Sequence, residues 1–322
     1  MSKWLALASA GVLAFGVAAC GDDSSDSTAS GGSGGGDLSG AVKIDGSSTV
    51  GPFAQAAAEQ FQGENPNVQI SVGTSGTGGG FEKFCAGETD ISDASRPIKD
   101  DEEAPICKKN GITFQEITVA NDGIAVVTNK DLEIDCMTVA QLKELWNTGS
   151  KITNYSQLDP KFPDVEVSLY GPGTDSGTFD FFTDEINGEE GVSRKEYQPS
   201  EDDNILVQGV SGDEGGLAYF GFSYYEQNQD ELNLVAVDGG DGCVKPSVEA
   251  IQDGSYKPLS RPLFMYPSEQ ALGSKSQVKG FMEYTVDNAE EIATAAQIVP
   301  LTAAQTDKAR QQLEEAEAKA GK

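Results

Sequence analysis

Three segments rich in glycine, serine and threonine are the part of the chain best suited to bind an anion. They cover residues 45–50, 73–80 and 171–178, and each stands between a predicted strand and a predicted helix. A helix N-terminus presents N–H groups without intrahelical partners and carries partial positive charge. Glycine lets an anion approach the backbone closely, and hydroxyl groups add further donors. Together the three segments predict a cradle for an oxyanion that needs few cationic side chains.

Each segment taken alone has a simpler explanation, because serine, threonine and glycine before a helix also act as ordinary N-caps. Three such segments, all in strand-to-helix loops, favour a shared site. None of them contains Gly-Lys-Ser/Thr, G-x-G-x-x-G or G-x-S-x-G. The sequence therefore gives little support to a P-loop, a dinucleotide site or the nucleophile elbow of a hydrolase.

A fourth segment, residues 90–98, places Arg96 in an otherwise acid-rich stretch. A guanidinium group can contact an oxyanion through two parallel hydrogen bonds. The alternative is a surface ion pair with Asp100 or Asp101, which is a common arrangement. Arg96 is the candidate cation of the site.

Alternating strand and helix patterns connect these segments. Residues 138–146 are predicted as a helix, with Thr138 as N-cap and Gln141 in the capping-box position. Alternation of this kind predicts an α/β fold with largely parallel sheets. Strands are predicted at 42–44, 68–72, 113–119, 123–127, 165–170, 234–237 and 263–266. The other helices are predicted at 50–62, 81–85, 176–186, 275–285 and 302–318.

The composition excludes several classes of function. The 322 residues include 52 Asp and Glu, 22 Lys and Arg and no histidine, with a formal net charge of −30. The missing imidazole excludes a Ser-His-Asp triad and zinc sites with histidine ligands. The acidity argues against nucleic acid as a partner and against adsorption to an anionic membrane surface.

The N-terminus has the features of an exported lipoprotein. Residues 1–19 resemble a secretory signal peptide. Lys3 supplies a positive charge near the start, and an apolar stretch follows it. The stretch ends in Val-Ala-Ala-Cys, which resembles the bacterial lipobox and predicts lipidation at Cys20. An ordinary signal peptide with a chance cysteine is the alternative. Residues 20–37 are rich in Gly, Ser and Asp and are predicted to act as a flexible tether.

Four further cysteines, Cys85, Cys107, Cys136 and Cys243, predict two disulfide bonds in an exported chain. Three pairings exist. We favour Cys85–Cys107, which is local, with Cys136–Cys243, which would then lie within another lobe. A metal site is the rival interpretation, but no C-x-x-C spacing supports it, and we expect no metal and no cofactor.

From about Lys43 to its C-terminus the chain resembles the phosphate-binding lipoproteins of phosphate-specific ABC transporters, the PstS family. The resemblance rests on residues 46–50, 76–79, 95–97 and 176–178, which occur in the order of the family. It implies a type II periplasmic binding protein of α/β class, a two-lobed Venus-flytrap in which two crossover strands join the lobes. Phosphate would lie buried between the lobes.

The resemblance also implies roles for individual residues. Backbone N–H groups and hydroxyls from the first two segments would contact the anion from one lobe, and those of the third segment from the other. Arg96 would be the charged partner. The implied ligand-binding residues are Ser48, Thr49, Val50, Ser75, Thr77, Gly78, Ser95, Arg96, Ser176, Gly177 and Thr178.

Two positions depart from the pattern of some family members. Pro172 stands where those members have an arginine, so the charge role is assigned to Arg96. Ser95 stands where they have an aspartate that accepts the remaining proton of phosphate and thereby rejects sulfate. Asp93, Asp175 or another nearby acid is left as the candidate proton acceptor.

These points lead to a functional hypothesis with defined alternatives. Residues 38–121 plus 263–322 would form lobe 1 and residues 122–262 lobe 2, with crossings at 119–124 and 262–266. The protein would capture inorganic phosphate and deliver it to the permease subunits of an ABC transporter, as a monomer held at the membrane by its lipid alone.

The alternatives are a binder of sulfate, molybdate or an organophosphate, a secreted phosphoester hydrolase, and a cell-surface adhesion or sensing module. The hydrolase lacks a supporting motif, so we expect no enzyme activity.

Overall fold

The computed structural model describes residues 38–321, and its strands form one mixed sheet of eleven strands. The main path of hydrogen-bonded strands is β2-β1-β3-β11-β4-β8-β6-β7, while β9 pairs with β4, β5 and β10. The strands are β1 (Gly40–Gly46), β2 (Val68–Gly73), β3 (Ile91–Ala94), β4 (Ile117–Asn129), β5 (Cys136–Thr138), β6 (Ser168–Pro172), β7 (Gln198–Ser200), β8 (Gly216–Gly221), β9 (Leu232–Asp238), β10 (Cys243–Val244) and β11 (Ser260–Pro267).

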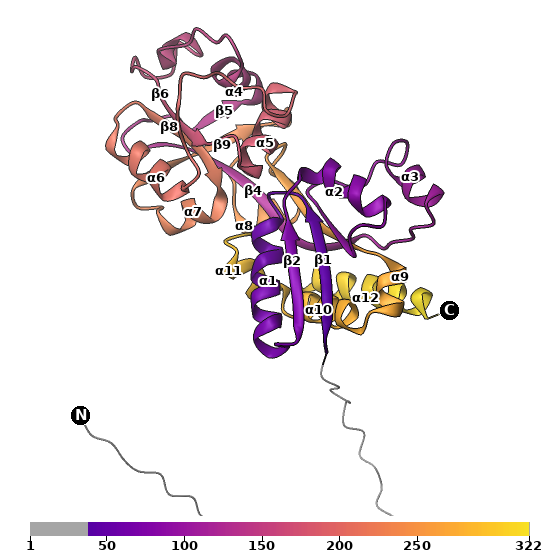
Figure 1. Cartoon of the computed structure of the whole chain (residues 1–322). Helices are drawn as coiled ribbons and strands as arrows, with labels where there is room; N and C mark the ends of the chain where they lie inside the picture. The colour runs from indigo at the N-terminus through magenta and orange to yellow at the C-terminus, as the bar shows by residue number, and fades with distance from the viewer. Residues whose placement is uncertain (1–37, 322) are drawn as a thin grey trace, which may run out of the picture. The chain divides into compact units, whose positions relative to one another are not determined.

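The helices flank this sheet throughout the described residues (Figure 1). The α-helices are α1 (Gly51–Glu64), α2 (Gly76–Cys85), α3 (Ala104–Lys109), α4 (Val139–Trp146), α5 (Gly177–Phe182), α6 (Asp203–Gly212), α7 (Phe222–Gln227), α8 (Val248–Gln252), α9 (Glu269–Ser274), α10 (Ser276–Asp287), α11 (Ala289–Ala295) and α12 (Ala303–Ala320). A 3-10 turn, η1 (Tyr155–Gln157), precedes β6, and a π-helical turn, η2 (Thr183–Asn187), continues α5.

Two large clusters of buried apolar side chains lie at the two ends of β4. The first core cluster joins α1, α10, α11 and α12 to β1 and to Ile117 and Val119 of β4. The second core cluster joins α4, α6, β8 and β9 to residues 124–127 of the same strand. Figure 1 shows α1, α10 and α12 beside β1 and β2, and α4 to α7 around β6, β8 and β9. The strand β4 therefore belongs to both cores.

The strand β4 is continuous, so the prediction of two separate strands at 113–119 and 123–127 was wrong. The polar residues Asn121 and Asp122 lie between the two predicted strands, and both are buried in the structure. Asn121 donates a hydrogen bond to the carbonyl of Pro300 at 3.1 Å, and Asp122 accepts one from Arg261 at 3.2 Å. The polar side chains of Asn121 and Asp122 are thus hydrogen-bonded to partners more than 130 residues away in the sequence.

The sheet is mixed rather than largely parallel. Parallel pairs join β1 to β2 and β3, β6 to β7 and β8, and β5 to β9. The strand β11 runs antiparallel to β3 and β4, and β4 runs antiparallel to β8 and β9. Each of these antiparallel pairs includes β4 or β11, two neighbouring strands that run in opposite directions.

Helix starts agree with the sequence in some places and differ in others. The capping box of Thr138 and Gln141 at α4 is confirmed. The helix α2 begins at Gly76 rather than at residue 81, so the last five residues of the segment 73–80 lie inside the helix. A β-carbon at Gly80 would lie 2.5 Å from the Cα of Gly46, so this glycine allows α2 to pack directly against β1.

Both favoured disulfide bonds, Cys85–Cys107 and Cys136–Cys243, are present in the structure. The first joins the end of α2 to α3, and the second joins β5 to β10. They close loops with sequence separations of 22 and 107 residues. A longer closed loop restricts the unfolded chain more strongly.

We therefore expect the two bonds to stabilise the protein unequally. Replacing both Cys136 and Cys243 by serine should lower the free energy of unfolding by about 5 kcal/mol, and the same change at Cys85 and Cys107 by about 3 kcal/mol. Chemical denaturation of the two double-serine variants measures the difference. Equal losses, or a larger loss from the shorter loop, would contradict the expected order.

The segments assigned to export lie outside the described residues. These are the signal peptide at 1–19, the lipidated Cys20 and the tether at 20–37. Within residues 38–321, no helix is both long enough and apolar enough to cross a membrane.

Candidate functional site

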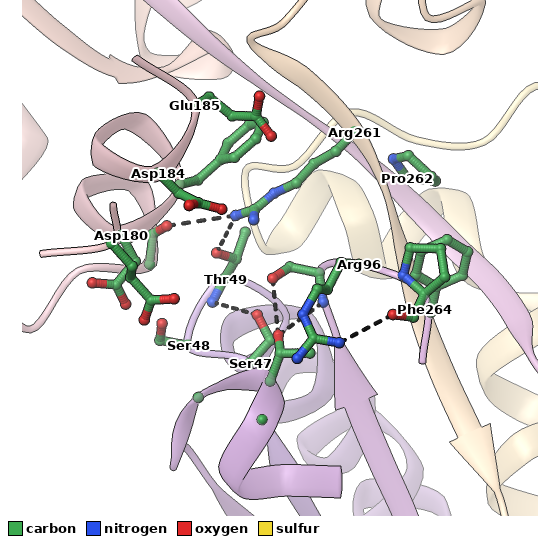
Figure 2. A pocket seen from close by; sticks show the side chains of 18 of the residues that line it. Ser47, Ser48, Thr49, Arg96, Asp180, Asp184, Glu185, Arg261, Pro262 and Phe264 are labelled. Carbon is green, nitrogen blue, oxygen red and sulfur yellow. Dashed lines mark hydrogen bonds between the residues drawn. The ribbon is translucent and has the colours of Figure 1, made fainter. Parts of the chain in front are cut away.

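A cavity of about 440 Å³ brings together the segments that the sequence singled out. One side of the cavity is formed by the turn after β1, the start of α2 and the loop after β3. The other side is formed by α5, η2 and the loop that follows. Residues Ser260, Arg261, Pro262 and Phe264 of β11 lie between the two sides. Figure 2 shows the turn that carries Ser47, Ser48 and Thr49 below the guanidinium group of Arg261.

The turn after β1 is held by its own hydrogen bonds. The backbone N–H of Ser47 donates to the carbonyl of Asp93 at 3.0 Å. The backbone N–H of Thr49 donates to the Ser47 hydroxyl oxygen at 3.2 Å. Ser47, Ser48 and Thr49 then line the cavity at the start of α1. Their hydroxyl groups are positioned by a turn that the strand β3 supports.

The loop before α2 is fixed by the carboxylate of Asp45. This group accepts hydrogen bonds from both the backbone N–H (3.2 Å) and the hydroxyl of Ser75, and it pairs with Lys83 at 2.6 Å. Burial raises the pKa of Asp45, but the hydrogen bonds from Lys83 and Ser75 outweigh this effect and hold the pKa below its ordinary value. Asp45 is therefore a charged anchor for the second segment, and the Ser75 hydroxyl is directed toward it.

Thr77 and Ser95 connect the second segment to the loop after β3. The Ser95 backbone N–H donates to the Thr77 hydroxyl oxygen at 3.2 Å, and the two hydroxyl oxygens lie 3.0 Å apart. Gly78 and Gly79 line the cavity next to them. The pair holds two hydroxyl groups at one place in the cavity wall.

The third segment approaches the first very closely. Ser176 is the N-cap of α5 and accepts a hydrogen bond from the backbone N–H of Thr178 at 3.2 Å. The next residue, Gly177, has no room for a side chain. A β-carbon there would lie 2.5 Å from the backbone nitrogen of Thr49 and 2.6 Å from the hydroxyl oxygen of Ser48. The absence of a side chain at Gly177 is what allows the two sides of the site to meet.

Arg261 links the two sides and was missed by the sequence interpretation. Its Nη2 donates to the Thr49 hydroxyl oxygen at 2.8 Å and to the carbonyl of Gly177 at 3.5 Å. Its guanidinium carbon lies 3.7 Å from the ring centre of Phe181, and its Nε pairs with Asp122 at 3.2 Å. Burial lowers the pKa of Arg261 and the pairing with Asp122 opposes this effect, so the group stays charged.

The contact with Arg261 also determines what Thr49 offers to a ligand. A guanidinium group has donors and no acceptor, so it occupies a lone pair of the Thr49 hydroxyl oxygen. The hydroxyl proton of Thr49 is then free to donate elsewhere. Arg261 thus contributes a positive charge and also orients a neighbouring donor.

Arg96 lines the cavity, but its charge is already paired. Its two terminal nitrogens donate to the carboxylate of Glu103 at 2.9 and 2.8 Å. The hydrogen bond to Glu103 raises the pKa of Arg96 above its ordinary value. The Asp100 and Asp101 pairings considered from the sequence are not the ones formed, and Glu103, the N-cap residue of α3, takes their place. Asp122 pairs with Arg261 through Nε alone, so Arg261 keeps more of its donors for a ligand than Arg96 does.

Most of the implied ligand-binding residues line one cavity, whereas others lie beside it. Val50 belongs to the first core cluster, and Ser176 and Thr178 flank Gly177 without being part of the cavity lining. The implied residues that do line the cavity are Ser48, Thr49, Ser75, Thr77, Gly78, Ser95, Arg96 and Gly177.

The two candidate proton acceptors lie away from the cavity surface. Asp175 is exposed, and its backbone N–H donates to Glu201 at 3.4 Å. Asp93 is fully buried in β3, with neither carboxyl oxygen hydrogen-bonded within the described residues. Burial, with a smaller contribution from Asp45, raises the pKa of Asp93 to about 8. Asp93 is thus a neutral buried acid at pH 7 behind the turn that carries Ser47.

The raised pKa of Asp93 makes a testable prediction about stability. The unfolded carboxyl group ionises near pH 4 and the folded one near pH 8, so between these values the folded state holds one more proton. Stability should therefore fall by about 1.4 kcal/mol per pH unit as the pH rises through this window. Relative to the wild type, Asp93→Asn should gain about 3 kcal/mol between pH 5 and pH 7.5 in denaturant titrations. A difference between the two proteins that does not change with pH would contradict this assignment.

Comparison with known proteins gives the family. Residues 27–289 match the family model described as a PBP superfamily domain. The chain is 42% identical over 264 residues to the phosphate-binding protein PstS of Staphylococcus saprophyticus, covering 81% of each chain. The chain belongs to the PstS family. It is also 47% identical over 265 residues to the protein SphX of Synechococcus elongatus, covering 81% of this chain and 78% of that protein.

Solved structures agree with the membership of this chain in the PstS family. A crystal structure described as a possible phosphate binding protein of Planctomyces limnophilus matches with a TM-score of 0.81 and 39% identity, covering 87% of this chain and 99% of that one. A protein of Clostridium perfringens with bound phosphate matches with a TM-score of 0.57 and 28% identity, covering 82% of this chain and 100% of that one. The fold is the type II periplasmic binding fold expected from the sequence. PstS proteins are extracytoplasmic solute-binding proteins of phosphate ABC transporters.

Proposed function

We propose that the protein binds inorganic phosphate in the cavity between α5 and the turn after β1. The observation that carries this proposal is the convergence of hydroxyl and N–H donors from three segments around the charged side chain of Arg261. Charge-assisted hydrogen bonds contribute about 1.5–3 kcal/mol each, and micromolar affinity requires about 8 kcal/mol. A few such bonds, together with Arg261, are sufficient for a tight site in a chain of net charge −30.

The ligand contacts proposed here combine sequence and structure. Thr49, Thr77, Ser95 and Arg261 act as side-chain donors, and Arg96 adds a second, weaker positive charge because Glu103 already pairs with it. The other implied residues, Ser48, Val50, Gly78, Ser176, Gly177 and Thr178, contribute through hydroxyl or backbone N–H groups when the two sides enclose the anion. Ser75 instead positions the loop before α2, because its hydroxyl and its N–H both donate to Asp45.

We also propose that the site lies between two lobes that close on the ligand. Lobe 1 comprises residues 38–121 plus 263–322 and lobe 2 residues 122–262, with crossings in β4 and β11. Support comes from the two core clusters, which meet near residues 120–124 of β4. A ligand that contacts both lobes favours the closed state by its differential affinity.

Delivery is the remaining part of the proposal. The protein hands phosphate to the permease subunits of an ABC transporter for import and acts as a monomer. A lipid on Cys20 anchors it to the extracytoplasmic face of the cell membrane, and residues 20–37 give it reach. Support comes from the sequence of the N-terminal segment and from relatives named phosphate-binding protein PstS. We propose no catalytic role.

Titration calorimetry tests the ligand directly. The protein without its first 37 residues is titrated with phosphate and with sulfate at about pH 8, at constant ionic strength. We expect micromolar or tighter binding of phosphate and at least 100-fold weaker binding of sulfate. Sulfate binding as tight as that of phosphate would contradict the assignment and favour a general binder of tetrahedral oxyanions. Competition by glycerol phosphate at equal concentration would favour an organophosphate binder.

A further inference from the structure

The cavity that presents donors on one side presents carboxylates on the other. Asp180 of α5, Asp184 and Glu185 of η2 and Glu190 of the next loop all line it. Figure 2 shows Asp180, Asp184 and Glu185 on the elements opposite the turn of Ser47 and Thr49. An ionised carboxylate repels an anion at short range, so these side chains need a role in a phosphate site.

Asp180 differs from the other three acids. It is half-buried, whereas Asp184, Glu185 and Glu190 are exposed. It lies three residues after Gly177, the residue that contacts Ser48 and Thr49 across the cavity. Asp180 is therefore the one acid of this group that α5 itself carries, one turn of the helix from Gly177.

The surroundings of Asp180 favour a protonated or proton-sharing carboxyl group. Burial, together with the charge of Glu190, raises the pKa of Asp180 to about 6, although Arg261 opposes the shift. The charged and titratable groups around Asp180 are Asp184 and Glu185 of η2, Glu190 of the following loop, Arg261 of β11, Asp122 of β4 and Tyr219 of β8.

We propose that Asp180 is the specificity-determining residue of this site and shares one proton with the bound anion. The inference rests on the proposed phosphate binding and assigns the proton acceptor that Ser95 cannot supply. It places that acceptor on α5, on the opposite side of the cavity from Asp93 and Ser95.

The proton count distinguishes phosphate from sulfate. Hydrogen phosphate carries a proton at neutral pH, and its P–O–H group donates that proton to the Asp180 carboxylate. Sulfate carries none, so the proton between sulfate and Asp180 comes from solvent. One proton taken up per sulfate lowers sulfate affinity about tenfold for each pH unit above the pKa of Asp180. Phosphate brings its own proton and avoids this loss.

The test compares phosphate and sulfate binding at pH 7 and pH 8 by calorimetry at constant ionic strength. In the wild type we expect sulfate affinity to fall about tenfold over this interval and phosphate affinity to change less than threefold. In Asp180→Asn the carboxamide also donates to sulfate, so the preference for phosphate should fall at least tenfold and the pH dependence of sulfate binding should disappear. Glu189→Gln, an exposed neighbour outside the cavity lining, is the matched control and should keep both properties.

Each outcome decides a separate point. An unchanged preference and an unchanged sulfate slope in Asp180→Asn would overturn the role of Asp180 while leaving phosphate binding intact. A wild-type protein that binds no phosphate would instead overturn the proposed function. The wild-type sulfate slope needs no variant, so a pH-independent sulfate affinity would overturn the inference even if Asp180→Asn failed to fold.

Discussion

Replacing Arg261 by glutamine is expected to lower phosphate affinity about 100-fold. The change removes a charge-assisted contact with the anion and also releases the Thr49 hydroxyl that Arg261 orients at 2.8 Å. Two such contacts, each contributing about 1.5–3 kcal/mol, account for a loss of this size. Calorimetry with phosphate measures it directly.

Arg96→Gln is the matched comparison, because Arg96 lines the same cavity and carries the same charge. Glu103 already neutralises it through two hydrogen bonds, so we expect a loss of less than tenfold. Arg261→Gln leaves Asp122 without its partner, and the free energy of unfolding must be measured in parallel to separate folding from binding. A larger loss from Arg96→Gln than from Arg261→Gln would show that the cation was assigned to the wrong arginine.

Gly177→Ala is expected to cause a loss of comparable size by a different mechanism. The new methyl group would overlap the backbone nitrogen of Thr49, which cannot move without shifting the start of α1. The two sides would stay apart, and the donors of one side would no longer reach an anion held by the other. Losing two hydrogen bonds in this way lowers affinity about 100-fold.

Gly212→Ala serves as the control for this substitution. Gly212 ends α6, has open space around it and does not line the cavity. We expect Gly212→Ala to retain phosphate affinity, while X-ray scattering of Gly177→Ala should show no compaction on adding phosphate. Full affinity and normal compaction in Gly177→Ala would mean that the approach of Gly177 to Thr49 is irrelevant to binding.

The local parts of the site were predictable because their chemistry is contained in short segments. Residues 45–50 and 73–80 carry glycine and hydroxyl groups next to a strand and a helix, and such loops present donors wherever the fold places them. The third segment was recognisable for the same reason. The sequence therefore identified the segments that supply the hydroxyl and N–H donors and eight of the residues that line the cavity.

Arg261 was not predictable by the same argument, because its role depends on contacts distant in the sequence. It follows a serine and precedes a proline near a predicted strand, with no glycine or hydroxyl pattern around it. Its partners, Asp122 and Thr49, lie 139 and 212 residues away. The pairing of β11 with β4 creates the site, and no local pattern indicates that register. An arginine directly before the predicted crossing at 262–266 was the one available signal.

Asp180 could not be recognised from the sequence for a different reason. An acid within a predicted helix is usually a solvated residue, so nothing distinguished it from its neighbours. Its importance follows from its distance along α5 from Gly177, and the contact of Gly177 with Thr49 becomes apparent only in three dimensions. Similarly, the burial of Asn121 and Asp122 within β4 depends on partners in distant segments, which no local pattern indicates.

A crystal structure of the protein grown with phosphate tests the central claim most directly. We predict one tetrahedral anion in the cavity between α5 and the turn after β1, within hydrogen-bonding distance of Arg261, Thr49 and the backbone of residues 176–178. One oxygen of the anion should face the Asp180 carboxyl group. An anion bound elsewhere, or an empty cavity in crystals that contain saturating phosphate, would contradict the proposed function.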